Sequence, residues 1–368
     1  SLTVRRLLRW LGTALLFLAV ALCFAPTLVP PFLDRVYYRG ASSGHFDGER
    51  FFNPGAPRLR PVNPQRFANR WSGERSAWPD RVAVRPSVPP RRVPGDIMLV
   101  TWIGHATVLV QTQGLNILTD PIWSERASPF SFAGPRRVRA PGIRFEDLPA
   151  IDLVLVSHNH YDHMDLATLR RLWERDRPLI VTSLGNDAIV AGGGARAVAR
   201  DWGGTVPVRP ARRLADGTLE GPIEVIVERN HHWGSRWFTD RNRALWSAFT
   251  VRTPGGSIFF AGDTGWGGGD WVREAARRGP FRLAIIPIGA YEPRDVMANN
   301  HVNPEDAWRI FEALDPVRAL GVHWGTFQLT FEPIGDPPRR LAALRRRHRD
   351  PRFIATEVGR AFSVPPAR

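Results

Sequence analysis

A cluster of ionisable side chains stands in the stretch LVSHNHYDHMD, residues 155–165, directly after the apolar run IDLVLV. Its members are His158, His160, Asp162 and His163. Such groups beside a buried strand would be expensive to remove from water without a compensating cation. Imidazole and carboxylate suit Zn²⁺, and the single cysteine, Cys23, lies far away in the sequence. The pattern therefore predicts a metal site in a loop at the C-terminal end of a buried strand.

So short a loop cannot easily surround one tetrahedral ion, but its side chains can divide between two ions. His158 and His160 can converge on one ion, while Asp162 and His163 turn toward the other. Two ions need further ligands, and later predicted strands end in suitable residues. The candidates are His232 in ERNHHWGSR, Asp263 in FFAGDTGW and His323 in GVHWGTF. Taken singly, such residues are more often surface, core or turn residues; the loop cluster is what makes them candidate ligands.

The elements that must position these residues begin after residue 96. Short apolar runs alternate with turn signals, and IMLVTWI, AIDLVLVS, SIFFAGD and RALGVHW are typical of buried strands. Helix-like segments lie between some of them, at 165–175, 271–278, 304–314 and 339–347. In each half, hairpin-like strands come first and strand–helix alternation follows. This order predicts an α/β sandwich of mixed sheets covered by helices.

The N-terminal segment, residues 1–33, has the composition of a signal anchor or a signal peptide. Three arginines precede a run without charge, residues 10–33. The helix-competent part would span about 24 Å, slightly less than the roughly 30 Å hydrocarbon core of a bilayer. No clean small-x-small cleavage site follows, which favours an uncleaved anchor. The arginines would then lie in the cytoplasm and the body would be periplasmic or extracytoplasmic. The pair Arg5-Arg6 is also compatible with a twin-arginine export signal.

Residues 34–95 are rich in Pro, Arg and Gly and show no sustained period, which predicts an irregular arm. Its aromatic residues suggest that the arm packs on the body, residues 96–368. The formal net charge is +15, and every basic residue is an arginine. This charge has two interpretations: attraction to an anionic surface, or codon usage in a GC-rich genome. Basic strands interleaved with aromatic residues are not found, so we expect no nucleic-acid partner.

The HxHxDH spacing, with a downstream His, a Gly-Asp and a last His at strand ends, resembles the metallo-β-lactamase superfamily over about residues 96–358. The blocks that carry a closer resemblance are WIGHATVLVQ, SHNHYDHMD, NHHWGSR, FFAGDTGW, IPIGAYEPR, HVNPEDAW and HWGTFQLTFEP. Together they resemble the branch of N-acylphosphatidylethanolamine-hydrolysing phospholipase D and its bacterial relatives. Less closely, they resemble the ascorbate-6-phosphate lactonase branch. The resemblance implies an αββα sandwich of two mixed sheets flanked by helices.

The same resemblance implies a pair of zinc ions. One ion would be bound by His158, His160 and His232, and the other by Asp162, His163 and His323, with Asp263 bridging both. Flavodiiron-type relatives have glutamate where this chain has His160, which favours a hydrolytic dizinc site over a redox site. Iron and manganese stay open as alternatives.

The resemblance also assigns roles around these ligands. His232 is preferred to His231 because the ligand in the family directly precedes a tryptophan, here Trp233; His231 would then support a ligand. His105 and Asp120 would orient ligands, or else be a buried polar residue and a turn aspartate. His301 matches a histidine near the substrate, or caps a helix. The aromatic residues near the motifs would line an acyl-chain channel or belong to the core: Trp233, Trp266, Tyr291, Trp324 and Phe327.

The expected activity is phospholipase D-type hydrolysis, in which a metal-bridging hydroxide cleaves a phosphodiester bond. Asp263 and His301 would be catalytic, and the products would be an N-acylethanolamine and phosphatidic acid. One alternative is a lactonase or another ester hydrolase, and a second is a non-catalytic, membrane-tethered metal-binding envelope protein. The expected partners are a phospholipid substrate, a membrane surface and a second copy of the chain.

Overall fold

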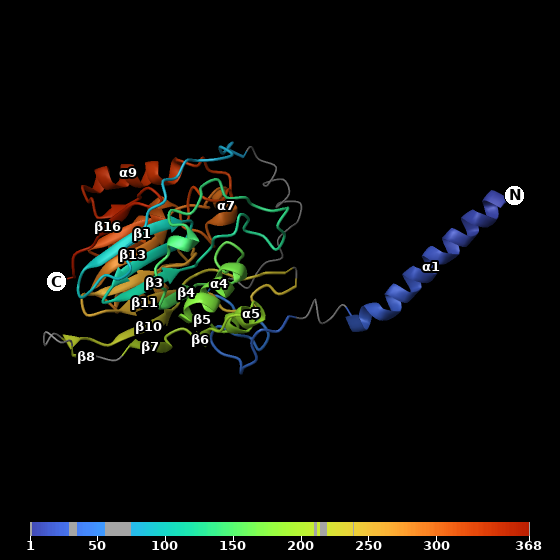
Figure 1. Cartoon of the computed structure of the whole chain (residues 1–368), viewed down its shortest axis with the longest axis horizontal. Helices are drawn as coiled ribbons and strands as arrows, with labels where there is room; N and C mark the ends of the chain where they lie inside the picture. Colours follow the sequence, from blue (N-terminus) through green and yellow to red (C-terminus); the bar gives the residue numbers. More distant parts are fainter. Residues whose placement is uncertain are drawn as a thin grey trace.

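The computed structural model describes residues 2–28, 35–55, 75–209, 212–213, 219–237 and 239–367. Parts of the predicted N-terminal segment (1 and 29–33) and of the arm (34 and 56–74) lie outside the described residues. The first helix, α1 (Leu2–Leu28), stands apart from the sheets in Figure 1. Its stretch Thr3–Phe24 is long and apolar enough to cross a membrane and is 0% buried. By length and composition, α1 fits a membrane anchor or a signal sequence.

The body is built on two seven-stranded sheets (Figure 1). Sheet A consists of β1 (Met98–Gly104), β2 (Thr107–Thr112), β3 (Leu115–Thr119), β4 (Leu153–Val156), β5 (Leu179–Ser183), β6 (Val198–Arg200) and β16 (Ala361–Ser363). Sheet B consists of β7 (Thr205–Arg209), β10 (Ile223–Glu228), β11 (Ala248–Arg252), β12 (Ser257–Phe260), β13 (Phe281–Pro287), β14 (Arg318–Val322) and β15 (Phe353–Ile354). A small ribbon pairs β8 (Arg212–Arg213) with β9 (Leu219–Glu220).

Both sheets are mixed and follow one plan. Sheet A has the order β16-β1-β2-β3-β4-β5-β6, antiparallel as far as β3 and parallel from there on. Sheet B has the order β15-β14-β13-β12-β11-β10-β7, antiparallel from β7 to β12 and parallel from β12 to β15. Hairpin strands therefore precede strand–helix units in each half, as the sequence predicted.

Helices cover the outer face of each sheet. They are η1 (Phe145–Asp147), α4 (Leu166–Asp176), α5 (Asn186–Gly192), α6 (Asp270–Ala276), α8 (Pro304–Leu314) and α9 (Asp336–His348). The short α7 (Arg294–Met297) follows β13 and has no buried residue. Asn303 starts α8, because its side chain accepts a hydrogen bond from the Asp306 amide and Pro304 needs no donor partner at the first turn. Figure 1 places α9 on one side of the sheets, and α4 and α5 beside β4 and β5.

Three apolar layers hold this arrangement together. The layer between the sheets includes Val110 of sheet A and Phe249 of sheet B. A second layer joins sheet B to α6, α8 and α9, and a third joins sheet A to η1, α4 and α5. The central strands are buried on both faces, which explains their continuous apolar runs, whereas the edge strands β6, β7 and β16 are partly exposed. The prediction of an αββα sandwich of two mixed sheets is confirmed.

The arm reaches the body at both of its described parts. Phe46 and Phe51 are buried against Leu245 and Trp246. Farther along, the Trp78 indole donates a hydrogen bond to the carbonyl of Glu332. Between its isolated bridges the arm has no regular element in the described residues. Side-chain packing and backbone hydrogen bonds to the body, such as those from Phe51 to Asn242 and from Ser87 to Gly142, fix its course.

Candidate metal centre

The predicted ligands meet at the C-terminal ends of strands from both sheets. His105 follows β1, Asp120 follows β3 and the loop 157–165 follows β4 in sheet A; His232, Asp263 and His323 follow β10, β12 and β14 in sheet B. Their ligand atoms form overlapping groups in which all atoms lie within 4.8 Å of one another. The parallel strands aim these ends at one edge of the sandwich, which is where open α/β sheets place their ligands.

One part of the centre consists of His158, His160 and His232, and we call it the imidazole half. His158 Nε2 lies 2.8 Å from His160 Nδ1, and His232 Nε2 lies 3.4 Å from the same atom. Burial is the main reason why the pKa of each of these histidines is lowered, to about 4 for His160 and well below the usual value for the other two. The three rings are therefore neutral at pH 7, the form that binds metals.

Hydrogen bonds on the far side of the rings select the nitrogen that faces inward. His232 Nδ1 lies 2.9 Å from the carbonyl of Asn300, which can only accept, so His232 Nε2 carries no proton. Ser157 Oγ donates to Asp120 Oδ2 and therefore accepts from His158 Nδ1, 2.9 Å away. His158 Nε2 is likewise left as a ligand atom. This is how ligand imidazoles are oriented in metal proteins.

The other part consists of Asp162, His163 and His323, and we call it the carboxylate half. Asp263 stands between the two halves: its Oδ2 lies 3.1 Å from His163 Nε2 and 3.0 Å from His323 Nε2, but also 3.9 Å from His232 Nε2 in the imidazole half. Its Oδ1 is buried and has no hydrogen-bond partner among the residues that the structure describes. One carboxylate therefore reaches both halves.

The charges of the carboxylate half differ from those of the imidazole half. Burial lowers the pKa of His323, but Asp263 and Asp162 outweigh it and raise that pKa to about 9. His163 behaves in the same way, and its pKa is raised well above the usual value. In return, although burial opposes it, His163 holds the pKa values of Asp162 and Asp263 well below their usual range. These carboxylates attract positive charge, which protons on the imidazoles or a metal cation can supply.

The spacing of the donors tests whether a metal ion fits. Four ligands about 2.0–2.1 Å from one tetrahedral cation stand about 3.3 Å apart. In the carboxylate half, Asp162 Oδ2 lies 3.2 Å from His163 Nε2 and 3.3 Å from His323 Nε2, and the two nitrogens are 3.1 Å apart. With the two distances to Asp263 Oδ2, five donor pairs lie between 3.0 and 3.3 Å. The residues present fit a bound cation.

Two residues that were expected to orient ligands contact them directly. His105 Nε2 lies 2.7 Å from Asp162 Oδ2, and Asp120 Oδ2 lies 2.6 Å from His163 Nδ1. His105, Asp120 and His323 all have positive φ angles, which cost non-glycine residues about 1–3 kcal/mol each. The fold keeps strained backbone at the points where these side chains must face the centre.

His301 also faces the centre, while His231 does not. His301 is buried, and its Nδ1 lies 3.7 Å from Asp263 Oδ2 and has no hydrogen-bond partner. Burial is the main cause that lowers the pKa of His301 to about 4. His231 belongs to none of the ligand groups among the described residues; its ring packs against Gly267, where an added Cβ would lie 2.2 Å from Nδ1.

The aromatic residues expected to line a substrate channel separate into two sets. The ring of Trp233 lies 4.3 Å from that of His160 and is half-buried; Trp266 and Trp324 are half-buried too. Tyr291 is fully buried, with its hydroxyl on Asp336, and Phe327 is buried beside the His105 ring. The last two belong to the core, because their apolar rings are covered on all sides.

Several supporting residues escaped the sequence analysis. Ser157 links His158 to Asp120 through two hydrogen bonds. Its position directly before His158 in the sequence was the signal that could have predicted this role. Asn53 of the arm donates from Nδ2 to the carbonyl of His232, 2.8 Å away, and accepts from the Trp246 indole at 3.0 Å. No local pattern marks Asn53, which lies 179 residues from His232 in the chain. The arm therefore holds the loop that carries one predicted ligand.

Comparison with known proteins shows the family of the chain. Residues 115–324 match the Beta-lactamase superfamily domain. N-acyl-phosphatidylethanolamine-hydrolyzing phospholipase D 1 of Caenorhabditis elegans is 34% identical over 278 residues, which cover 73% of this chain and 76% of that protein. The mitochondrial enzyme of the same description from Saccharomyces cerevisiae is 32% identical over 247 residues, 66% of this chain and 51% of that protein.

The solved structure of Igni18, a metallo hydrolase from Ignicoccus hospitalis, has a similar fold. It aligns with a TM-score of 0.52 and 17% identity, over 73% of this chain and 98% of that chain. At this identity the likeness concerns the fold alone. The sequence matches go further: this chain belongs to the metallo-β-lactamase superfamily of metal-dependent hydrolases, in the branch of N-acylphosphatidylethanolamine-hydrolysing phospholipase D and its bacterial relatives.

Proposed function

We propose that the protein is a dizinc phosphodiesterase that hydrolyses N-acylphosphatidylethanolamine, or a related phospholipid, to an N-acylethanolamine and phosphatidic acid. The observation that carries the proposal is Asp263, whose Oδ2 faces donors of both halves while Oδ1 is buried without a partner. A site that only stored metal would not need a carboxylate between two donor sets. The relatives named for this reaction support the choice of substrate.

The imidazole half would hold one zinc ion and the carboxylate half the other, with Asp263 shared. When bound, such ions lower the pKa of water toward about 7 and neutralise charge on phosphate oxygens in the transition state. The neutral histidines of the imidazole half and the ionised aspartates favour this filling, because metal ligands must be free of protons, whereas His163 and His323 must first give up theirs.

The residues themselves have separate tasks in the reaction. Asp263 Oδ1 can accept a proton from the water that attacks phosphorus, because this oxygen has no other hydrogen-bond partner. His301 Nδ1, neutral at pH 7, can exchange a hydrogen bond or a proton with the phosphate or the departing alcohol oxygen. Arg294 donates to the carbonyl of His301 at 2.7 Å and so holds this histidine in place.

The apolar helix α1 would keep the enzyme at its lipid substrate. We propose that Thr3–Phe24 spans the membrane, with the arginines near its start on the cytoplasmic side and the body outside the cytoplasm. A phosphodiester in the headgroup region would then be within reach of the tethered body.

The test is product analysis with the purified full-length protein loaded with zinc. N-acylphosphatidylethanolamine in mixed micelles is expected to give phosphatidic acid and N-acylethanolamine, both measured by mass spectrometry. In water enriched with ¹⁸O, the label should enter phosphatidic acid and not the alcohol, because attack is at phosphorus. Chelation should abolish turnover, and re-added zinc should restore it.

Two further substrates separate the competing functions. Bis-p-nitrophenyl phosphate should be cleaved, while an acyl lactone should not. Cleavage of the lactone alone would replace the proposal with an ester hydrolase. Bound zinc without turnover of any substrate would replace it with a metal-binding envelope protein.

A further inference from the structure

A hairpin between β3 and η1 exposes two aromatic side chains to solvent. Outside α1, the large apolar residues that are exposed among the described residues are Val36, Val88, Ile97, Phe130 and Phe132. The two phenylalanines stand close together at the hairpin tip, with exposed fractions of 48% and 78% and ring centroids 5.5 Å apart. Paired exposed aromatics leave apolar area in water, which marks interaction surfaces.

The base of this hairpin is held firmly to the body. Arg126 and Arg136 pair across it, and the Ala127 amide donates to the carbonyl of Pro135. Next to them, the buried Arg137 donates to the carbonyls of Ser124, Ile122 and Arg139. The tip therefore projects from a fixed base, and its position does not depend on its own apolar contacts.

The charges around the tip suit a phospholipid surface. No charged residue occurs from Ala127 to Pro135. Arg126, Arg136 and Glu125 flank this stretch; the Arg136 side chain is 70% exposed and its Nε lies 3.9 Å from Glu125 Oε2, so the rim keeps a net positive charge. An apolar tip with a basic rim places rings among acyl chains and guanidinium groups at the level of anionic headgroups.

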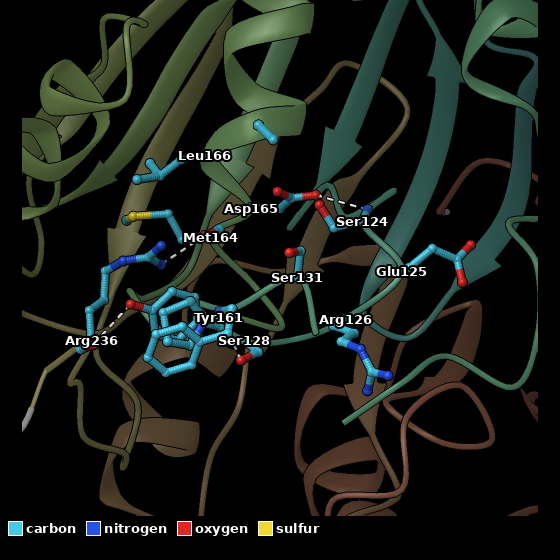
Figure 2. Close-up of a pocket in the computed structure, with 13 residues that line it drawn as sticks. Ser124, Glu125, Arg126, Ser128, Ser131, Tyr161, Met164, Asp165, Leu166 and Arg236 are labelled. Atoms are coloured by element: carbon cyan, nitrogen blue, oxygen red, sulfur yellow. Dashed lines mark hydrogen bonds between the residues drawn. The ribbon is translucent and has the colours of Figure 1, made fainter. Parts of the chain in front are cut away.

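The hairpin also borders a pocket beside the metal-binding loop. The pocket has a volume of about 370 Å³ and lies between Ser124–Ser131 on one side and Tyr161, Met164 and Arg236 on the other. Figure 2 shows Tyr161 and Arg236 together at one wall, and Glu125 and Arg126 at the opposite wall. Tyr161 stands between His160 and Asp162 in the chain, so the hairpin tip lies close to the candidate centre.

We propose that Phe130 and Phe132 insert into the phospholipid surface and that Arg126 and Arg136 bind its anionic headgroups, so that the pocket beside the metal loop opens toward the lipid. This inference goes beyond the proposed reaction and does not depend on turnover. It names a second membrane contact besides α1, which would orient the body rather than merely tether it.

Site-directed spin labelling of the full chain in lipid nanodiscs tests the proposal. Cys23→Ser removes the only cysteine, and Ala133→Cys then places a label beside the tip while both phenylalanines remain. In nanodiscs of phosphatidylcholine and phosphatidylglycerol, the label should be reached by oxygen and shielded several-fold from a water-soluble nickel complex. A label at Val88→Cys, a residue that is 72% exposed in the arm, should stay accessible to nickel.

Added substitutions separate the two parts of the surface. Phe130→Ser with Phe132→Ser should return the label at position 133 to the accessibility of the Val88 label. Arg136→Gln should weaken the dependence of shielding on phosphatidylglycerol content.

Two results would overturn the proposal. One is equal nickel accessibility at positions 133 and 88; the other is spin–spin broadening in detergent, which would mean that a second copy covers the tip. Hydrolysis of bis-p-nitrophenyl phosphate, measured in the same samples, reports the proposed reaction separately from the docking.

Discussion

The two halves of the candidate centre favour metal binding for opposite electrostatic reasons. The imidazole half is buried and free of carboxylates of its own, so its histidines stay neutral because desolvation lowers their pKa values. The carboxylate half gathers negative charge, and its two histidines hold protons at neutral pH. The imidazole half provides neutral nitrogen lone pairs, and the carboxylate half provides negative charge. Asp263 links them, so the strength of either site depends on a residue that both share.

Removing the shared carboxylate should have the largest effect. In Asp263→Asn, both halves lose the negative oxygen between them, so we expect zinc content to fall below two ions per chain. Hydrolysis of bis-p-nitrophenyl phosphate should fall by more than about 100-fold, beyond the range typical of residues that only support ligands. Elemental analysis and kcat measure the two effects. Full zinc content together with full activity would contradict the bridging position.

The neighbouring residues His231 and His232 provide a matched pair of substitutions. Only the substitution of His232 should disrupt the imidazole half. His232→Asn should remove one zinc ion and lower kcat by about 100-fold, because the imidazole half loses a ligand atom. His231→Asn should leave both metal content and kcat within about twofold, since its ring packs on Gly267, outside the ligand groups. Zinc content per chain distinguishes the two variants. If His231→Asn lost zinc and His232→Asn kept it, His231 would be the ligand.

Asp120 is predicted to act on both halves from outside them. It accepts from His163 Nδ1 at 2.6 Å and from Ser157 Oγ, which holds His158. Asp120→Asn should weaken binding of both ions by about 10–100-fold, whereas Ser157→Ala should weaken only the ion of the imidazole half. Competition with a chromophoric chelator measures both affinities. If Ser157→Ala affected both ions equally, the relay through Ser157 would be wrong.

Proton release on metal binding should distinguish the halves directly. In the metal-free protein His323, whose pKa Asp263 and Asp162 raise to about 9 although burial opposes it, is protonated at pH 7 and must lose its proton to bind a cation. His160, with a pKa lowered to about 4, has none to lose. Affinity in the carboxylate half should therefore rise from pH 7 to pH 9, while the imidazole half should weaken only as the pH falls toward 4. Calorimetry in buffers of different ionisation enthalpy counts the protons.

The sequence predicts the centre well where ligands follow strands directly. The loop after β4, together with Asp263 after β12 and His323 after β14, could be predicted because a buried apolar run that ends in a metal-binding side chain is a local pattern. The two mixed sheets followed from the same runs and are confirmed. Of the two roles that the sequence left open for Tyr291, the structure favours the core, where its hydroxyl faces Asp336; proximity to a motif alone could not decide between them. Contacts made across long separations, such as those of Asn53, leave no local signal.

Substitution of Asn53 should have the smallest effect on zinc binding, and this effect should be confined to the imidazole half. Asn53→Asp keeps an oxygen for the Trp246 indole but loses the donor to the carbonyl of His232. A lost hydrogen bond of this kind costs about 1 kcal/mol, so we expect zinc to leave the imidazole half several-fold faster. The carboxylate half should be unchanged, because the described part of the arm makes no hydrogen bond to its ligands.

Cobalt substitution provides a readout of Asn53 that activity alone would not give. Only the absorption bands of the ion in the imidazole half should shift in Asn53→Asp, because the loop that carries His232 gains freedom while the rest of the site keeps its supports. Ser42→Ala, an exposed change in the same arm, is the control for general effects on the arm. If both ions changed together, the arm would stabilise the whole fold and would not specifically hold His232. The irregular arm is thus expected to act on one half of the centre through a single side-chain amide.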